Sequence, residues 1–292
     1  INLGTGRTAV AVDAGDRHTC AILDNGDLKC WGYDNKGQLG DGGSNTNTNA
    51  PSSTAINLGT GRTAVAVSVG VYHTCAILDN GDLKCWGYEY HGQLGDGGSN
   101  TNTNAPSSTA IDLGTGRTAV AVDSWSHHTC AILDNGDLKC WGYNVYGQLG
   151  DGGSNTNTNA PSSTAINLGS GRTAVAVSAG NSHTCAILDN GDLKCWGYDG
   201  QGQLGDGGSN TNQGSAVAVS GSNTWDATTT IVTWETHPAL PAGMSISGGT
   251  ISGTPSVYAL NQTYTIYANK SGYSTTHELY FSVDTNNPHT VV

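Results

Sequence analysis

The stretch His18-Thr-Cys-Ala-Ile-Leu-Asp-Asn-Gly-Asp-Leu-Lys-Cys-Trp-Gly-Tyr33 decides the fold of this chain. Two runs suited to β-strands flank Asp24-Asn25-Gly26, and a glycine at this point permits the positive φ of a three-residue hairpin loop with a bulge. The stretch is therefore predicted to form an antiparallel hairpin. The same letters return at 73–88, 128–143 and 183–198.

Around this hairpin the whole chain repeats with a period of 55 residues. The copies begin at Ile1, Ile56, Ile111 and Ile166, and the first two copies differ at only seven positions. The fourth copy stops matching after about Asn212. We therefore expect a repeat region over 1–220, made of repeats 1–55, 56–110, 111–165 and 166–220, and a C-terminal module over 221–292.

Each repeat carries signals for short antiparallel strands. In the first copy, a strand over 8–12 precedes the hairpin, and a fourth strand is predicted over 55–58, after the turn-rich run 37–43 and the polar loop 44–51. Three or four short strands in roughly 50 residues are typical of one blade of a β-propeller. The predicted fold class is therefore all-β, with four-stranded blades of the propeller type.

The motifs His-Thr, Asp-Asn-Gly-Asp, Trp-Gly and Gly-Gln-Leu-Gly occur in this order in all four copies. Their order resembles the regulator-of-chromosome-condensation repeat family over about residues 1–220. The resemblance implies a β-propeller, although the four copies fall short of the seven blades usual in that family. It implies no single function, because the members include nuclear exchange factors and secreted bacterial inhibitor propellers.

The C-terminal module has a different pattern, with short strands predicted over 231–234, 244–246, 250–252, 264–268 and 278–283. The runs from Leu240, Gly249 and Tyr264 resemble the Ig-like modules of large microbial surface proteins. This resemblance implies a small β-sandwich that serves as a spacer. Asn261 and Asn269 begin N-x-Ser/Thr sequences and are candidate N-glycosylation sites.

The eight cysteines occur in pairs at fixed positions in each hairpin. Counting outward from the tip places Cys20 opposite Cys30, where Cβ atoms of facing residues lie about 4.5–5.5 Å apart, near the reach of a disulfide. Four disulfides are therefore predicted, Cys20–Cys30, Cys75–Cys85, Cys130–Cys140 and Cys185–Cys195. Zinc bound by His18, Cys20 and Cys30 is the alternative, but it lacks a fourth ligand and the short cysteine spacing of zinc modules.

Disulfides indicate secretion or exposure at a cell surface. The first residue is Ile, which fits a processed or partial form of a longer precursor. A net charge of −12 with only 11 Lys and Arg argues against nucleic acid as a partner. No apolar run reaches the ~18 residues of a membrane helix, so no membrane insertion is expected.

No catalytic constellation stands out in the sequence. The histidines at 18, 73, 128 and 183 recur at one repeat position and are interpreted as structural, and the glycine-rich runs do not lead into a helix. Calcium bound through side-chain oxygens of the loop from Asp41 to Asn49 remains an alternative. We expect no enzymatic activity, no cofactor and no metal.

The copies differ almost entirely in two short windows, 13–17 and 34–36 in the first repeat, which are predicted to emerge at the same end of each blade. Free drift of loops does not explain why the equally exposed Asp-Asn-Gly tips are identical in every copy. The windows are therefore predicted to form a binding face, because aromatic and arginine side chains are typical contact anchors. Drift, or packing between molecules, is the alternative. The candidate residues are Arg17, Lys36, Tyr72, Tyr90, His91, Trp125, His127 and Tyr146.

Two functions follow from these observations. The first is a non-enzymatic extracellular structural or adhesive protein of a microbial cell surface, a filament subunit assembled head to tail with other copies of itself. Residues 1–4 would then complete the fourth blade of the next copy, or of the same chain in a closed ring, and 215–220 is predicted to be a fifth first strand. The second is a soluble secreted recognition or inhibitor propeller that binds a protein or glycan ligand.

Overall fold

The computed structural model describes residues 1–98, 100–153 and 156–220, and the backbone of five strands between 233 and 283. The chain divides into two compact units, Ile1–Thr224 and Trp225–Val292. The described residues form strands and turns, and they include no helix long and apolar enough to cross a membrane.

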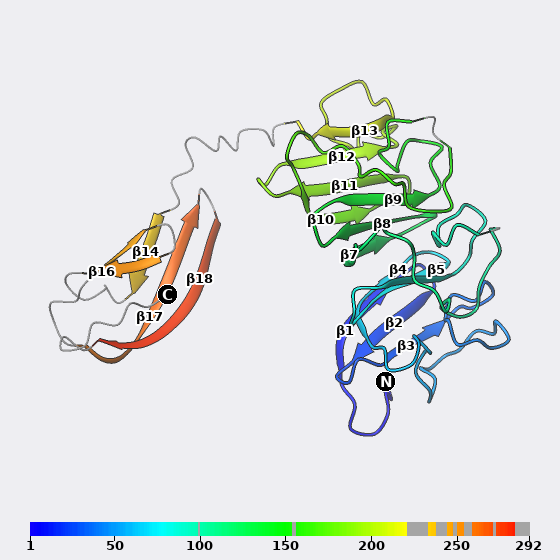
Figure 1. The fold of residues 1–292 in the computed structure, drawn as a ribbon, viewed down its shortest axis with the longest axis horizontal. Helices are drawn as coiled ribbons and strands as arrows, with labels where there is room; N and C mark the ends of the chain where they lie inside the picture. The colour runs from blue at the N-terminus through cyan, green and yellow to red at the C-terminus, as the bar shows by residue number, and fades with distance from the viewer. Residues whose placement is uncertain are drawn as a thin grey trace. The chain divides into compact units, whose positions relative to one another are not determined.

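The repeat region is a row of antiparallel sheets, one for each repeat, stacked side by side as propeller blades (Figure 1). Within each sheet, strands that follow one another in the chain lie next to each other. The all-β, propeller-type fold expected from the sequence is confirmed. The strands are β1 (Ala9–Ala14), β2 (His18–Leu23) and β3 (Leu28–Gly32) in the first blade, β4 (Ala64–Val69), β5 (His73–Leu78) and β6 (Leu83–Gly87) in the second, β7 (Ala119–Ser124), β8 (His128–Leu133) and β9 (Leu138–Gly142) in the third, and β10 (Ala174–Ala179), β11 (His183–Leu188), β12 (Leu193–Gly197) and β13 (Gln213–Ala218) in the fourth.

The fourth strand of the first three blades differs from the prediction. At the edge of β3, Gly32 and Thr48 form an isolated bridge with N–H to O distances of 2.9 and 2.8 Å, inside the predicted polar loop. The predicted strand 55–58 is not regular, because Ile56 makes a single bond from its N–H to the Leu28 carbonyl, at 2.9 Å. The Ile56 side chain is buried and completes the core cluster between the first two blades.

The fourth blade is completed by its own chain. β13 pairs with β12 in an antiparallel ladder, and the N–H of Val219 donates to the Leu193 carbonyl at 3.2 Å, where Ile56 bonds Leu28 in the first blade. The prediction of a fifth first strand over 215–220 is therefore wrong. The place foreseen for residues 1–4 of another copy is also occupied, because β13 of the same chain pairs with the β12 edge.

The core lies between blades. Each of three apolar clusters joins one blade to the next, and each contains a fully buried tryptophan: Trp86, Trp141 and Trp196. Between the first two blades, His18 Nε2 and the Thr74 hydroxyl lie 2.8 Å apart, and the Trp86 indole N–H donates to the Gln38 carbonyl at 3.1 Å. Packing of neighbouring blades against each other is therefore what stabilises the row.

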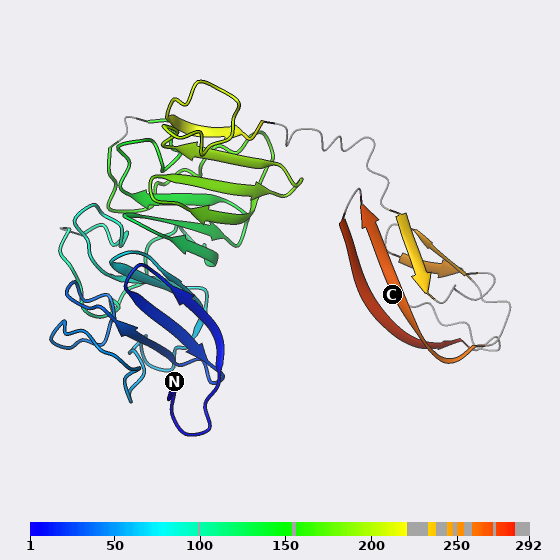
Figure 2. The ribbon, with the colours of Figure 1, turned by 180° about the vertical axis from the view of Figure 1, so that it is seen from behind.

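The C-terminal unit contains a three-stranded antiparallel sheet and a separate hairpin, both visible in Figure 2. β14 (Thr233–His237), β17 (Ala259–Lys270) and β18 (Tyr273–Val283) form the sheet, and β15 (Met244–Ser247) and β16 (Thr250–Gly253) form the hairpin. The strands predicted over 244–246 and 250–252 are confirmed, and the last two are longer than expected. The first overlaps its prediction only at 233–234, because β14 continues to His237 and residues 231–232 lie outside the described residues. Asn261 and Asn269 both belong to β17, and their side chains lie outside the described residues.

Candidate binding face

The four predicted disulfides are present. Cys20 on β2 faces Cys30 on β3, and their Cα atoms lie 4.1 Å apart. The other three pairs have the same separation and register, and the structure has no free cysteine. Because the sulfur atoms are bonded to each other, the thiolates that a zinc site needs are not available.

The first residue of each variable window serves the fold. Asp13 accepts a hydrogen bond from the N–H of Val69 in the next blade, at 2.6 Å, and Asp34 accepts one from the N–H of Leu39, at 2.8 Å. Ser68, the counterpart of Asp13 in the second blade, similarly contacts the third blade, because its hydroxyl lies 2.9 Å from that of Ser124. These positions therefore hold blades and turns in place.

Position 34 and its counterpart 89 bury a carboxyl group. Burial raises the pKa of Asp34 to about 6 and that of Glu89 to about 8, although a backbone N–H donated to each carboxylate opposes the shift. Asn144 occupies the same position in the third blade and accepts from the N–H of Leu149 at 3.0 Å. The position thus requires a hydrogen-bond acceptor and does not require a charge.

The later residues of the windows meet at one end of the blades and form a continuous row of aromatic rings, here called the aromatic ladder. Successive ring centroids lie 4.8–6.4 Å apart, within the range of favourable aromatic pairs. The ladder crosses from the first blade to the fourth. Its members are Tyr33, Tyr72, Tyr88, Tyr90, His91, His127, Tyr143, Tyr146 and Tyr198.

Two cationic side chains lie at the first-blade end of the ladder, and one of them, Arg17, is paired with Asp16 at 2.9 Å. The Arg17 guanidinium is 5.5 Å from the Tyr33 centroid and the Lys36 amino group is 5.6 Å from the Tyr88 centroid, distances typical of cation–π contacts. Burial, together with the neighbouring His91, lowers the pKa of His127 to about 4, and burial also lowers the pKa of His91. Both imidazoles are therefore neutral at neutral pH, and the middle of the ladder is uncharged.

Seven of the eight candidate residues lie in the ladder or against it. The eighth, Trp125, is 37% exposed and has no ring contact with the ladder among the described residues, while its carbonyl accepts the N–H of Val71 at 2.7 Å. The tyrosine of each Trp-Gly-Tyr was missed, because it is identical in every copy and the sequence argument relied on differences. The position of this tyrosine directly before the second window could have identified it as part of the same surface. These missed residues are Tyr33, Tyr88, Tyr143 and Tyr198.

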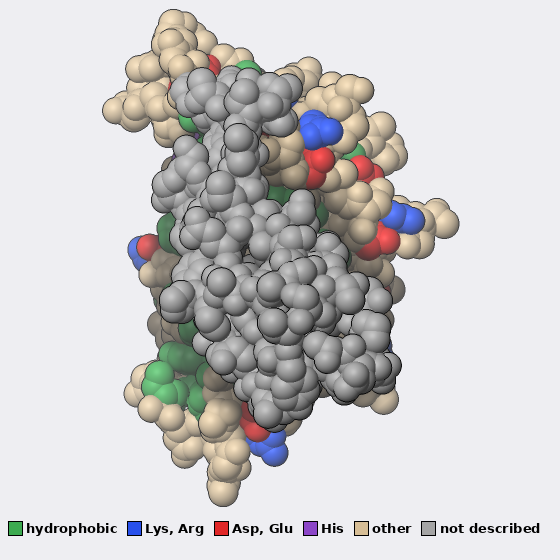
Figure 3. Space-filling model, turned by 90° about the vertical axis from the view of Figure 1, so that its left-hand side faces the viewer, with side chains coloured by type: hydrophobic (Ala, Val, Ile, Leu, Met, Phe, Trp, Pro, Cys, Tyr) green, Lys and Arg blue, Asp and Glu red, His purple; other side chains and the backbone are tan. Residues whose placement is uncertain are grey.

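The charged surface is patterned differently. Arg7 and Asp24 form an exposed ion pair at 3.2 Å near the hairpin tip, and the counterparts of this pair recur in the other three blades. In Figure 3, basic side chains likewise lie next to acidic ones at several places on the face in view. Exposed pairs of this kind are worth little stability, so they chiefly balance local charge.

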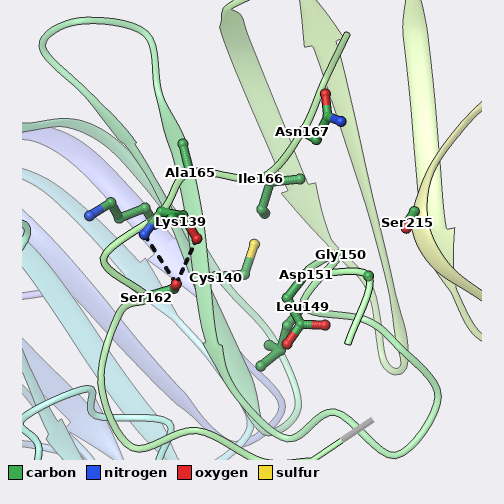
Figure 4. A pocket seen from close by; sticks show the side chains of 12 residues that line it. Lys139, Cys140, Leu149, Gly150, Asp151, Ser162, Ala165, Ile166, Asn167 and Ser215 are labelled. Atoms are coloured by element: carbon green, nitrogen blue, oxygen red, sulfur yellow. Dashed lines mark hydrogen bonds between the residues drawn. The ribbon is translucent and has the colours of Figure 1, made fainter. Parts of the chain in front are cut away.

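A cavity of about 220 Å³ lies beside β9 and β13 (Figure 4). Its two charged lining residues are already engaged: the Lys139 amino group donates to the Leu113 carbonyl at 3.0 Å and points away from the other lining side chains, and Asp151 accepts the N–H of Gly153 at 2.9 Å. Among the described residues no three His, Cys, Asp or Glu side chains cluster as a metal site. The ladder is therefore the best candidate site.

Comparison with known families gives two matches. Profiles of the Regulator of chromosome condensation (RCC1) repeat match residues 9–38, 64–93 and 174–203 and residues 25–77 and 135–187. The profile of the Putative Ig domain matches residues 201–285.

Similar proteins share the repeats over part of their length. The ultraviolet-B receptor UVR8 of Arabidopsis thaliana is 31% identical over 71% of this chain and 45% of the receptor. The human E3 ubiquitin-protein ligase HERC2 is 28% identical over 68% of this chain and 4% of the ligase.

Solved structures share the fold. Human WBSCR16 superposes with a TM-score of 0.63 at 24% identity, over 73% of this chain and 53% of that protein. Yeast RCC1 (Prp20), solved with Kap60 bound, gives 0.63 at 18% identity, over 75% of this chain and 50% of that protein. The chain thus spans about half the length of these relatives, or less. From its repeated blades and these matches, the chain belongs to the RCC1 repeat family and carries an Ig-like module after its repeats.

Proposed function

We propose that this chain is a non-enzymatic extracellular recognition module that binds a protein ligand through the aromatic ladder. One observation carries the proposal: most of the aromatic and histidine residues that differ between otherwise identical repeats converge, together with the tyrosines beside them, into one continuous surface across four blades. The fold brings these loops to the same end of every blade, and what supports a common role is that their rings contact one another from blade to blade.

The chemistry of the ladder suits protein recognition. Tyrosine offers a large amphipathic contact area at a low cost in conformational entropy, which is why it dominates antibody binding sites. The ladder rings are mostly half-buried and contact each other, so little side-chain freedom is left to lose on binding. A rigid β scaffold also holds the loops in position before the ligand arrives.

The charges indicate which ligand surface fits. The chain carries a net charge of −12, and Lys36 places a positive charge over Tyr88, whereas Arg17 is paired with Asp16. A protein surface with an apolar centre and an acidic edge complements this arrangement. Yeast RCC1 (Prp20), which shares this fold, has been solved with the protein Kap60 bound.

The disulfides support a location outside the cell. Four disulfides in about 200 residues persist only where thiols are not kept reduced. The Ig-like module fits a spacer that carries the repeats away from a microbial surface. The other function expected from the sequence is a structural or adhesive role. Such a role would depend on the exposed sides of the first and fourth blades, where further copies could bind.

Site-specific photocrosslinking tests the binding proposal. The full chain carries p-benzoylphenylalanine in place of Tyr90, which is 67% exposed on the ladder, or in place of Asn80, exposed at the hairpin tip on the opposite end. Each protein is irradiated with the surface and secreted proteins of the source organism. We expect a discrete protein adduct from position 90 alone, and its loss when Tyr88→Ala and Tyr143→Ala are added.

Equal adducts from both positions, or none from position 90, would contradict the proposal. A glycan array probed with the same chain separates the ligand classes. Glycan binding that disappears with Tyr88→Ala, without a protein adduct, would assign the ladder to carbohydrate.

A further inference from the structure

Every blade of the repeat region has two different sides. One side, the His face, carries the recurring histidine, the isoleucine four residues after it and the carbonyl of the Gly-Gln-Leu-Gly glutamine. The other side, the Trp face, carries the recurring threonine, the recurring tryptophan and the second valine of the first strand. In the first two blades, the His face holds His18, Ile22 and Gln38, and the Trp face opposite holds Thr74, Trp86 and Val67.

The contact between these faces occurs three times in the chain with the same geometry. The histidine ring lies 2.8, 3.0 and 2.9 Å from the next blade's threonine hydroxyl. The tryptophan N–H donates to the preceding blade's glutamine carbonyl at 3.1, 3.1 and 2.9 Å. The row is therefore built from one interface used repeatedly.

The two ends of the row leave one face of each kind uncovered. Ile187 on the fourth blade is 44% exposed, whereas its counterparts Ile22, Ile77 and Ile132 are each 2% exposed. Val12 on the first blade is 66% exposed, whereas Val67 packs against a core cluster. Within the described residues, the His183 ring and the Trp31 indole have no hydrogen-bond partner, unlike their counterparts inside the row.

We propose that the His face of the fourth blade docks on the Trp face of the first blade in a second copy of this chain, head to tail. The fourth blade has the same His, Ile and Gln residues as the three blades that already make this contact, and the first blade has the same Thr, Trp and Val. Each exposed face thus matches a partner surface that the chain itself contains. His183 would meet Thr19, and Trp31 would reach the Gln203 carbonyl.

This contact is heterologous, so each copy can receive one neighbour and be received by another. It replaces the strand exchange expected from the sequence, since Val219 already occupies the edge of β12. The contact surface is apolar and uncharged at its centre, which permits association despite a net charge of −12 on each copy.

Two single variants and their mixture test the proposal by sedimentation velocity of the full chain with its disulfides intact. Ile187→Asp blocks the His face of the fourth blade, and Val12→Asp blocks the Trp face of the first, because each would bury an unpaired carboxylate in the contact. We expect wild-type chains to form dimers or longer species as concentration rises. Each variant alone should remain a monomer, with affinity reduced roughly 100-fold or more.

The mixture gives the decisive result. A Val12→Asp chain still has a working His face and an Ile187→Asp chain still has a working Trp face, so together they should form a 1:1 dimer and nothing larger. The matched control is Val175→Asp. Val175 is 60% exposed, and its counterparts inside the row, Val65 and Val120, are 59% exposed, so this position lies outside the contact. It should associate like the wild type.

A wild-type chain that stays monomeric at 100 µM would overturn the proposal, as would assembly of either single variant. A mixture that remains monomeric would also overturn it, because the contact would then not be head to tail. Far-ultraviolet circular dichroism and thiol titration establish that both variants keep the β fold and all four disulfides. Ile187 and Val12 are exposed in the single chain, so their substitution should leave its folding intact.

Discussion

The sharpest stability prediction concerns Glu89, the carboxyl group that closes the Gly-Gln-Leu-Gly turn of the second blade. Its side chain is completely buried and one oxygen accepts the N–H of Leu94 at 2.6 Å, while the other oxygen has no hydrogen-bond partner. Burial raises its pKa from the ordinary 4.5 to about 8. Between these two values the folded chain keeps a proton that the unfolded chain has lost.

The sign of the pH dependence follows from this difference. Stability falls as pH rises wherever the folded state binds more protons, so this group costs nothing below pH 4.5 and progressively more up to about pH 8. At pH 7 the cost is about 3 kcal/mol, from about 1.4 kcal/mol for each pH unit above the ordinary pKa. Glu89→Gln keeps an acceptor for Leu94 and cannot ionise in either the folded or the unfolded state. It should therefore stabilise the protein by about 3 kcal/mol at pH 7 and by almost nothing at pH 4.5.

Urea unfolding of the disulfide-bonded chain at pH 4.5, 6, 7 and 8 measures the effect, and the difference between variant and wild type at each pH isolates this group from all others. The reciprocal control is Asn144→Asp, which places a carboxyl group at the same position of the third blade and should introduce a stability loss that grows with pH. A difference between Glu89→Gln and wild type that does not change from pH 4.5 to pH 8 would refute the reasoning.

Two further predictions concern the contact between the second and third blades. Trp141→Phe removes an indole N–H that donates to the Gln93 carbonyl at 3.1 Å, and it should reduce stability by about 1–2 kcal/mol. Trp31→Phe, at the uncovered end of the row, should reduce stability much less. Urea unfolding compares the two variants, and equal losses of stability would contradict this account. Gly95→Ala would place a Cβ 2.3 Å from the Trp141 Nε1 at a φ of +73°, whereas Gly97→Ala has the similar φ of +69° with nothing within 4 Å. Gly97→Ala should cost about 1–2 kcal/mol of backbone strain, and Gly95→Ala should cost clearly more. Equal melting temperatures of the two variants would contradict the close packing of Gly95 against Trp141.

The local features of the fold could be predicted from the sequence. The Asp-Asn-Gly tip, with Gly26 at a φ of +80°, sets the register of the hairpin, and the register places Cys20 opposite Cys30. Hairpin geometry depends on residues that are neighbours in the chain, so counting from the tip was sufficient. The 55-residue period then extended one hairpin to four.

The candidate site was predicted only in part. Differences between copies identified Tyr72, His91 and Tyr146, but the same reasoning hid Tyr88, which is identical in all copies and yet lies in the middle of the ladder. It also assigned all of both windows to one surface, although Asp13 holds the next blade through the N–H of Val69. A residue's role in these windows depends on its neighbour in the next blade, about 55 positions away.

The sequence by itself determined the repeats, the all-β class, the disulfide pairing and the end of the blades where variation gathers, because each follows from local geometry or from the chain's comparison with itself. Only the tertiary structure decided which segment completes each blade. Thr48 bonds the edge of β3 where 55–58 was expected to form a strand, and β13 pairs with the edge of β12 where residues 1–4 were expected. The tertiary structure alone also showed that the core lies between blades. A face that is buried inside the row and exposed at its ends has the same sequence in both places, and only its position in space distinguishes them.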